Sequence, residues 1–152
     1  MKFFMFFVFL VTLVVSVDSF AQNADEEVEL LVMDGTWKGD TYRDAKRSIV
    51  YRMDEFGAVK DKKGNDIIIV IGNSYRNRHN QVIGRFLVGE EVRSSSGRLL
   101  GRINQYGEIR DFYGTYLGEL KDLTPQQAAV QYFLWDQLVE RHLRTRKNQL
   151  PD

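Results

Sequence analysis

Apolar and polar residues recur along the middle of this chain with a period of 16 or 17 residues. Each unit starts with an apolar residue, which we count as position 0, and a basic residue follows at position 1. Apolar residues return at positions 8 and 11. The five units start at Tyr42, Val59, Tyr75, Val92 and Ile109. Such regular self-similarity indicates one small structural unit that is repeated several times.

Two turn signatures divide each unit into a pair of short strands. Asp61–Gly64 and Asp111–Gly114 begin with Asp, which favours a type I turn, and end with Gly at position 5, where a positive φ is expected. Asp54–Gly57 and Asn104–Gly107 repeat this chemistry at the second turn. About four to six residues rich in Ile, Val, Leu and Tyr lie between turns, which suits short strands. The pattern predicts an antiparallel meander of about ten strands over residues 42–120.

Glycines at position 9 indicate a distortion within the second strand of a unit. Gly84, Gly101 and Gly118 lie between the apolar positions 8 and 11, which strict alternation would send to opposite faces. A bend or bulge there would bring both apolar residues to one core. Because a lone hairpin is marginal in water, we expect the hairpins to share a core as the petals of a small flower-like ring. The first unit departs from the pattern, with Arg47 at position 5 and Tyr51 at position 9.

This signature resembles the four-fold beta flower domain of secreted Bacteroidota proteins. The resemblance is clearest in the units that start at Val92 and Ile109, with Gly97, Gly101 and Gly118 in place. It covers about half of the chain that follows residue 21. The resemblance implies a fold and carries no catalytic residues.

A C-terminal helix is predicted over residues 124–147. Thr124 and Gln127 form a capping box, and Pro125 suits the first helical position. An apolar stripe follows at helical spacing, widened by Phe133, Leu134 and Leu138; it consists of Ala128, Tyr132, Trp135, Val139 and Leu143. We expect this helix to pack on the repeat domain. Residues 22–41 form an N-terminal segment with a candidate strand over 30–37, so the fold class is mainly β with one C-terminal α-helix.

The first 21 residues read as an export signal. Lys2 precedes an apolar run over 3–17, and Ala21 completes a small-residue cleavage site before Gln22. The alternative is an uncleaved anchor, but the apolar run is shorter than the roughly 20 residues of a spanning helix. Cysteine is absent, so packing alone must hold the exported protein together. We expect a protein without a membrane anchor after cleavage, either secreted or periplasmic.

Composition and motifs argue against most catalytic chemistry. The formal net charge is +0, which gives no reason to expect nucleic-acid binding. His79 and His142 are far apart in the sequence, and without cysteine they indicate no metal site. No phosphate-binding loop or nucleophile motif is present, so no cofactor or catalytic residue is predicted. Asp44, Asp61 and Asp111 recur at one repeat position and could supply paired carboxylates, but turn formation explains them more simply.

The basic residues at position 1 are the candidate ligand-binding residues. They are Arg43, Lys60, Arg76, Arg93 and Arg110, and Arg52, Arg85 and Arg102 recur at position 10. Equivalent placement would form a circle of positive charge for an acidic glycan or an envelope protein. The alternative is a solvated strand face balanced by nearby carboxylates.

These observations favour a secreted non-enzymatic binding or structural module. The alternative function is a hydrolase that acts on an extracellular polymer through carboxylates brought together by the repeats.

Export generates the first testable prediction. The isolated protein should begin at Gln22, because the apolar run and Ala21 fit signal-peptidase cleavage. Intact-mass and N-terminal analysis of the exported protein would check this. An N-terminus at Met1 would contradict cleavage and would indicate an anchored form.

Overall fold

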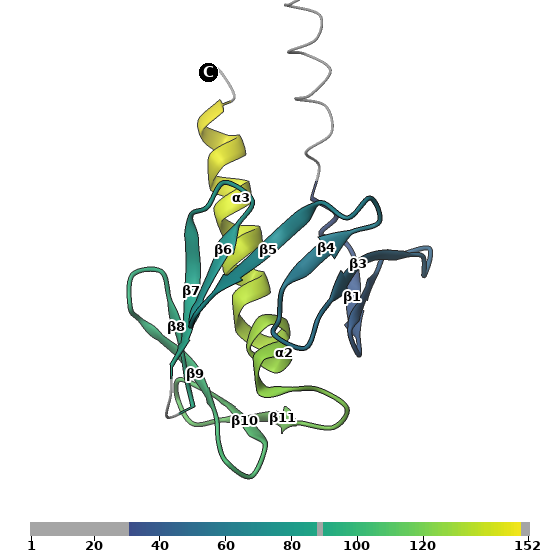
Figure 1. Ribbon diagram of the computed structural model, residues 1–152. Coiled ribbons are helices and arrows are strands. Elements are labelled where there is room, and N and C mark those ends of the chain that lie inside the picture. Colours follow the sequence, from purple (N-terminus) through teal and green to yellow (C-terminus); the bar gives the residue numbers. More distant parts are fainter. Residues whose placement is uncertain (1–30, 88–89, 150–152) are drawn as a thin grey trace, which may run out of the picture. The chain divides into compact units, whose positions relative to one another are not determined.

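Eleven short strands follow one another in a single antiparallel meander, and each strand pairs with its neighbours in the sequence. The computed structural model describes residues 31–87 and 90–149 (Figure 1). The predicted export signal, its predicted cleavage site and the acidic residues up to 30 lie outside the described residues. The strands are β1 (Thr36–Lys38), β2 (Thr41–Arg43), β3 (Ile49–Met53), β4 (Val59–Asp61), β5 (Asp66–Ile71), β6 (Ser74–Asn77), β7 (Val82–Leu87), β8 (Glu91–Ser94), β9 (Leu99–Ile103), β10 (Glu108–Asp111) and β11 (Tyr116–Glu119).

The repeat period corresponds to the buried core. All five residues at position 0 are buried, with at most 2% of their surface exposed, and one of them lies in every second strand from β2 to β10. The predicted meander of ten strands over residues 42–120 is confirmed as β2 to β11. The candidate strand over 30–37 is present as β1, which begins later and ends one residue beyond it.

The turn at position 5 has the expected left-handed backbone in every unit. Gly64, Gly97 and Gly114 have φ between 85° and 87°, and Asn80 has φ 62°. Arg47 adopts φ 64° despite its side chain, so the first unit keeps the turn although its sequence departs from the pattern. In each turn the position-5 N–H donates to the carbonyl that opens the turn, at 2.9–3.1 Å.

A β-bulge lies at position 8 of every unit. In the unit that starts at Val92, Val92 pairs with Gly101 and Arg93 pairs with Leu99, so Leu100 is the extra residue. The same shift follows each of the other position-0 residues. A bulge re-aims side chains, and it leaves one of the two apolar positions buried in four units: Met53 and Ile103 at position 11, and Ile67 and Ile83 at position 8. Leu117, the position-8 residue of the last unit, is 42% exposed.

The C-terminal helix consists of α2 (Pro125–Ala129), a π-helical turn η1 (Val130–Leu134) and α3 (Trp135–Gln149). The predicted capping box is present: the Thr124 hydroxyl accepts from the Gln127 N–H at 3.1 Å, and the Gln127 side chain accepts from the Thr124 N–H at 3.0 Å. The first half is buried, as expected. Leu143 was expected on the apolar stripe, but its side chain is exposed. The C-terminal part of α3 extends beyond the strands (Figure 1).

Consecutive helix residues face the second strands of different units. A Cβ at Gly118 would meet Tyr132, one at Gly101 would meet Phe133, and one at Gly84 would meet Leu134, all within 2.8 Å. Trp135 packs on Tyr51, the position-9 residue of the first unit, at 5.5 Å between ring centroids. Successive helix residues point about 100° apart, so the side chains radiate to the surrounding strands. The position-9 glycines therefore make room for the helix.

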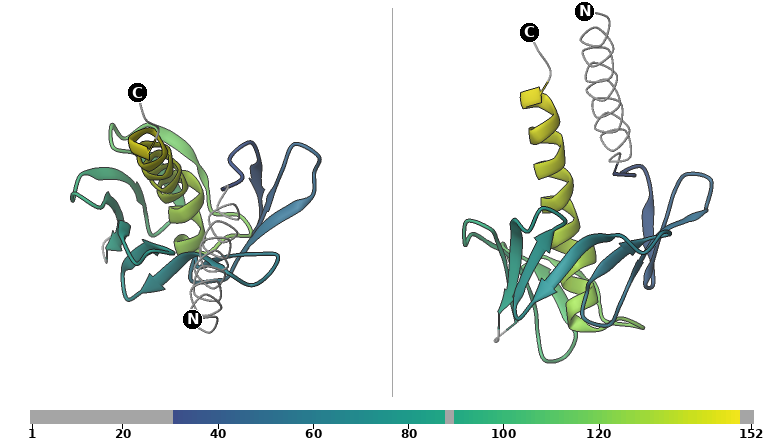
Figure 2. Two further views of the ribbon diagram at one scale, coloured as in Figure 1. Left: turned by 90° about the horizontal axis from the view of Figure 1, so that it is seen from above. Right: turned by 45° about the horizontal axis from the view of Figure 1, so that its top comes forward.

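The hairpins lie on several sides of this helix, and we call them petals (Figure 2). The sheet does not close into a hydrogen-bonded ring, because the first strand, β1, does not pair with the last strand, β11. Side-chain packing holds β1 instead: Trp37 contacts Trp135 at 5.2 Å and Tyr42 at 5.3 Å between ring centroids. Residues 32–152 form one compact unit.

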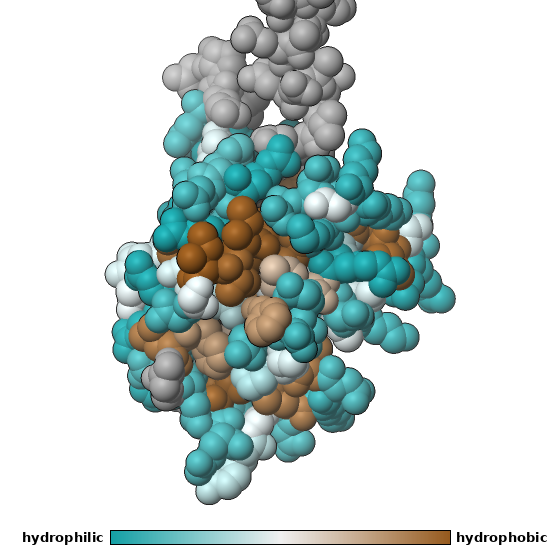
Figure 3. Space-filling view, viewed as in Figure 1, coloured by the Kyte–Doolittle hydropathy of each residue, from teal (hydrophilic) through white to brown (hydrophobic). Residues whose placement is uncertain are grey.

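Exposed aromatic side chains lie in the turns. Phe112 and Tyr113 occupy the tip of the last petal, whereas Phe56 and Tyr106 lie in turns that join neighbouring petals, and the two tyrosines are about 80% exposed. On the face seen in Figure 3, hydrophobic patches are separated by hydrophilic residues.

Gly101→Val tests the fit between helix and petals. We expect a loss of roughly 2 kcal/mol or more in the free energy of unfolding, because the new side chain would overlap the Phe133 ring and the Arg110 carbonyl. Gly97→Asn is the matched control, since Asn80 occupies the equivalent site and a Cβ at Gly97 meets no atom within 4 Å. Denaturant unfolding would measure both changes. Equal stability of Gly101→Val and the wild type would contradict this packing.

Trp135→Ala tests the role of the helix as core. Trp135 is buried and contacts three aromatic rings, so its truncation should cost about 3–5 kcal/mol. Fluorescence in a Trp37→Phe background should show a blue-shifted Trp135 that iodide quenches poorly. A red-shifted, fully quenched Trp135 would mean that the helix does not pack on the petals in solution.

Candidate functional site

The basic residues at position 1 support the turns that follow them. Four arginines donate from Nη1 to the carbonyl of the position-5 residue. The donor–acceptor pairs are Arg43 to Arg47 at 3.0 Å, Arg76 to Asn80 at 3.1 Å, Arg93 to Gly97 at 2.8 Å and Arg110 to Gly114 at 3.0 Å. Lys60 instead forms an ion pair with Asp66 at 2.7 Å. Turn support explains the recurrence of arginine at this position without a ligand.

Two of these arginines also form an ion pair with a glutamate two residues before them in the sequence. Glu91 Oε2 accepts from Arg93 Nε at 2.9 Å and from Arg93 Nη2 at 2.7 Å, while Glu91 Oε1 accepts from Arg102 at 3.1 Å. These hydrogen bonds, first that from Arg93 and then that from Arg102, lower the pKa of Glu91. Glu108 is placed similarly beside Arg110, at 3.3 Å. Glu108 therefore offsets the charge of Arg110, and Glu91 offsets one of the two charges of Arg93 and Arg102.

The recurring aspartates act as turn-forming residues. The Asp61 carboxylate accepts from the Lys63 N–H at 2.8 Å and the Asn65 N–H at 2.9 Å. Burial alone would raise the pKa of Asp61, but the hydrogen bonds from Asn65 and Lys63 outweigh it and the pKa is lowered. Asp111 accepts two turn N–H groups in the same way, and Asp44 accepts one. The three carboxylates belong to three different turns, β2–β3, β4–β5 and β10–β11, where each stabilises its own turn.

The histidines do not assemble a metal site. No group of three or more His, Cys, Asp or Glu residues suited to a metal ion occurs in the described ranges 31–87 and 90–149. The pKa of His142 is lowered by burial and then by the positive charges of Arg146 and Arg78. A cationic neighbourhood of this kind disfavours a bound cation.

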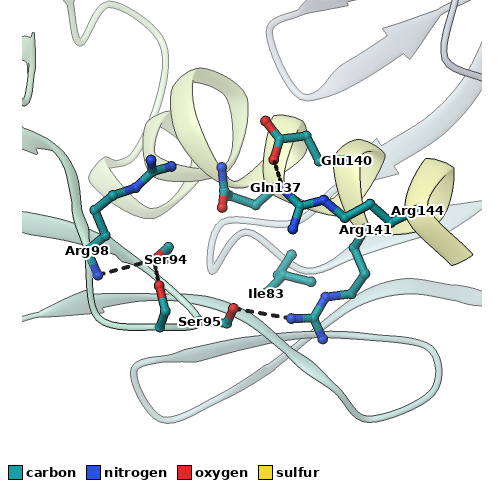
Figure 4. Close-up of a pocket in the computed structure, with 9 residues that line it drawn as sticks. Ile83, Ser94, Ser95, Arg98, Gln137, Glu140, Arg141 and Arg144 are labelled. Atoms are coloured by element: carbon teal, nitrogen blue, oxygen red, sulfur yellow. Dashed lines mark hydrogen bonds and ion pairs between the residues drawn. The ribbon is translucent and has the colours of Figure 1, made fainter.

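A polar pocket lies between α3 and the β8–β9 hairpin (Figure 4). Its volume is about 350 Å³. It is lined by Ile83, Ser94, Ser95, Ser96, Arg98, Gln137, Glu140, Arg141 and Arg144. The lining thus holds three guanidinium groups, three serines and one carboxylate.

The pocket side chains come from two elements that face each other. Arg98 reaches from the hairpin toward the helix, and Arg141 reaches from the helix to donate to the Ser95 hydroxyl at 3.2 Å (Figure 4). Arg144 contacts Glu140 at 3.5 Å, so Glu140 offsets one of the three positive charges. A guanidinium group can bind a planar acid group through two parallel hydrogen bonds. The arrangement is suited to holding an anionic group.

The sequence pattern did not predict this pocket. Ser94–Ser96 lie in the turn that ends at position 5 of their unit, and Arg141 and Arg144 lie in α3. The available signal was the spacing of Gln137, Arg141 and Arg144, which places three long polar side chains on one helix face. That spacing alone could not show that a hairpin with three serines lies opposite.

Comparisons with known proteins give no relative: no family model, curated protein or solved structure matches this chain. Among the described residues, no helix has the length and apolar character needed to cross a membrane.

Proposed function

We propose that this chain is an exported, non-enzymatic binding module of the four-fold beta flower type that recognises an acidic glycan. Its site is the pocket between α3 and the β8–β9 hairpin. After removal of residues 1–21 the module acts in the periplasm or outside the cell. The petals and the buried helix serve as a rigid scaffold for the site.

The observation that carries this proposal is the excess of positive charge in the pocket. Arg98, Arg141 and Arg144 outnumber the one carboxylate, Glu140, and serine hydroxyls and Gln137 add neutral hydrogen-bonding groups. A volume of about 350 Å³ is at the small end of the range for ligand pockets, which suits one acidic sugar residue. Hydroxyl and amide groups beside guanidinium groups match a ligand that carries both an acid and several hydroxyls.

The alternative, a hydrolase, has less support. Glycoside hydrolysis by the usual route needs two carboxylates that flank the scissile bond, and the pocket holds one. Asp44, Asp61 and Asp111 each serve a separate turn. Burial and then the neighbouring Glu140 raise the pKa of Asp136, but Asp136 does not line the pocket. We therefore favour binding over catalysis.

Binding of the mature protein to an array of acidic and neutral oligosaccharides would test the proposal, followed by calorimetry on the best ligand. We expect an acidic oligosaccharide to bind and its neutral counterpart not to bind. Arg141→Gln and Arg144→Gln should each weaken binding about tenfold or more, because each loses a charge-assisted hydrogen bond.

Arg146→Gln is the matched control, because Arg146 lies on the same helix but does not line the pocket. Its affinity should stay near that of the wild type. Equal losses in all three variants would indicate a general charge effect and would contradict the assignment of the pocket. Release of shorter oligosaccharides during incubation would contradict a non-enzymatic function.

A further inference from the structure

The repeat allows equivalent sites to be compared within one chain. In the unit that starts at Val92, Glu91 lies opposite Arg102 across β8 and β9, and its carboxylate binds both Arg93 and Arg102. The Nε and Nη2 atoms of Arg93 hold one carboxylate oxygen, while Nη1 supports the turn. In this unit, a carboxylate of the chain itself occupies the site between the two arginines.

The unit that starts at Tyr75 has the same frame without the carboxylate. Ser74 lies opposite Arg85 across β6 and β7, just as Glu91 lies opposite Arg102. Arg76 supports its turn through Nη1, as Arg93 does. Serine thus stands at the position where Glu91 offsets part of the charge of two arginines in the next unit.

The consequence of this replacement is visible at Arg76. Its Nε atom is buried and has no hydrogen-bond partner. For Arg85, no hydrogen bond or ion pair occurs within residues 31–87 and 90–149. A buried N–H of a charged group without an acceptor is costly, since it has lost water without gaining a partner. The site is built for an acceptor that this unit does not supply.

We propose that Ser74, Arg76 and Arg85 form a second binding site, which takes the carboxylate of an acidic peptide side chain from a partner protein. The incoming carboxylate occupies the place that the Glu91 carboxylate has in the next unit along the chain, against Arg76 Nε and Nη2 and the Arg85 guanidinium. A glutamate side chain fits, because a glutamate side chain makes these contacts in the equivalent unit. The site shares no residue with the pocket on α3.

The first unit repeats the arrangement. Thr41 lies opposite Arg52, and Arg43 also has a buried Nε without a hydrogen-bond partner. Thr41 differs from Ser74 in that its hydroxyl donates to the Lys38 carbonyl at 2.9 Å and its side chain is buried. The Ser74 site is therefore the more open of the two.

Nuclear magnetic resonance of the arginine Nε–Hε groups would test the site in the mature protein. On titration with penta-glutamate, the Arg76 signal should shift with saturation, whereas the Arg93 signal should stay because Glu91 already fills its site. Penta-glutamine is the neutral control and should shift neither signal.

Two exchanges sharpen the test. Ser74→Glu should fill the site from within and abolish the response of Arg76, and Glu91→Ser should open the equivalent site so that Arg93 responds. If Ser74→Glu fails to fold, the gain of response in Glu91→Ser still tests the proposal. Arg141→Gln should leave the response of Arg76 unchanged, which separates this site from the proposed glycan pocket.

An unchanged Arg76 signal at saturating penta-glutamate would overturn the proposal, as would a response of Arg76 that persists in folded Ser74→Glu. A response of Arg76 to tetragalacturonate but not to penta-glutamate would overturn the assignment to a peptide, because the carboxylate would then come from a glycan.

Discussion

The close contact between the buried helix and the second strand of each petal is the constraint on which this structure depends. Tyr132, Phe133 and Leu134 occupy the space that side chains at Gly118, Gly101 and Gly84 would fill. Large residues on the helix thus complement absent side chains on the strands. Two-stranded petals bury little surface among themselves, so this shared contact turns marginal hairpins into one stable unit.

The turns add a second, local requirement. A positive φ at position 5 opens each hairpin, and an arginine from the preceding strand holds the carbonyl of that residue. In the first unit the turn forms with Arg47, an ordinary L-residue, at the left-handed position, where Arg43 and Asp44 both support it. The same arginines are then available for acid groups through their remaining N–H groups, so structural and binding roles meet on one side chain.

The period predicted the strands, the turns and the core residues well because these are local features. The apolar residues at position 0, the turns that end at position 5 and the capping box at Thr124 can each be recognised from a few neighbouring residues. The reason for the position-9 glycines could be predicted only in part, because the contact between Gly101 and Phe133 joins residues far apart in the sequence. The pocket was not predicted, since it depends on which hairpin lies opposite Arg141. The repeat makes Ser74 and Glu91 equivalent, but only the register shows that each lies opposite an arginine, on which the proposed second site depends.

The order of elements along the chain has a consequence for the route by which the protein folds. The helix that supplies the common core follows all of the petals in the sequence. Until it is available, each petal is an isolated hairpin that lacks a partner for its apolar side. Contacts of such long sequence separation form late and slowly. We therefore expect the polypeptide to stay largely unfolded until the helix emerges, a delay that would suit the proposed export of the chain.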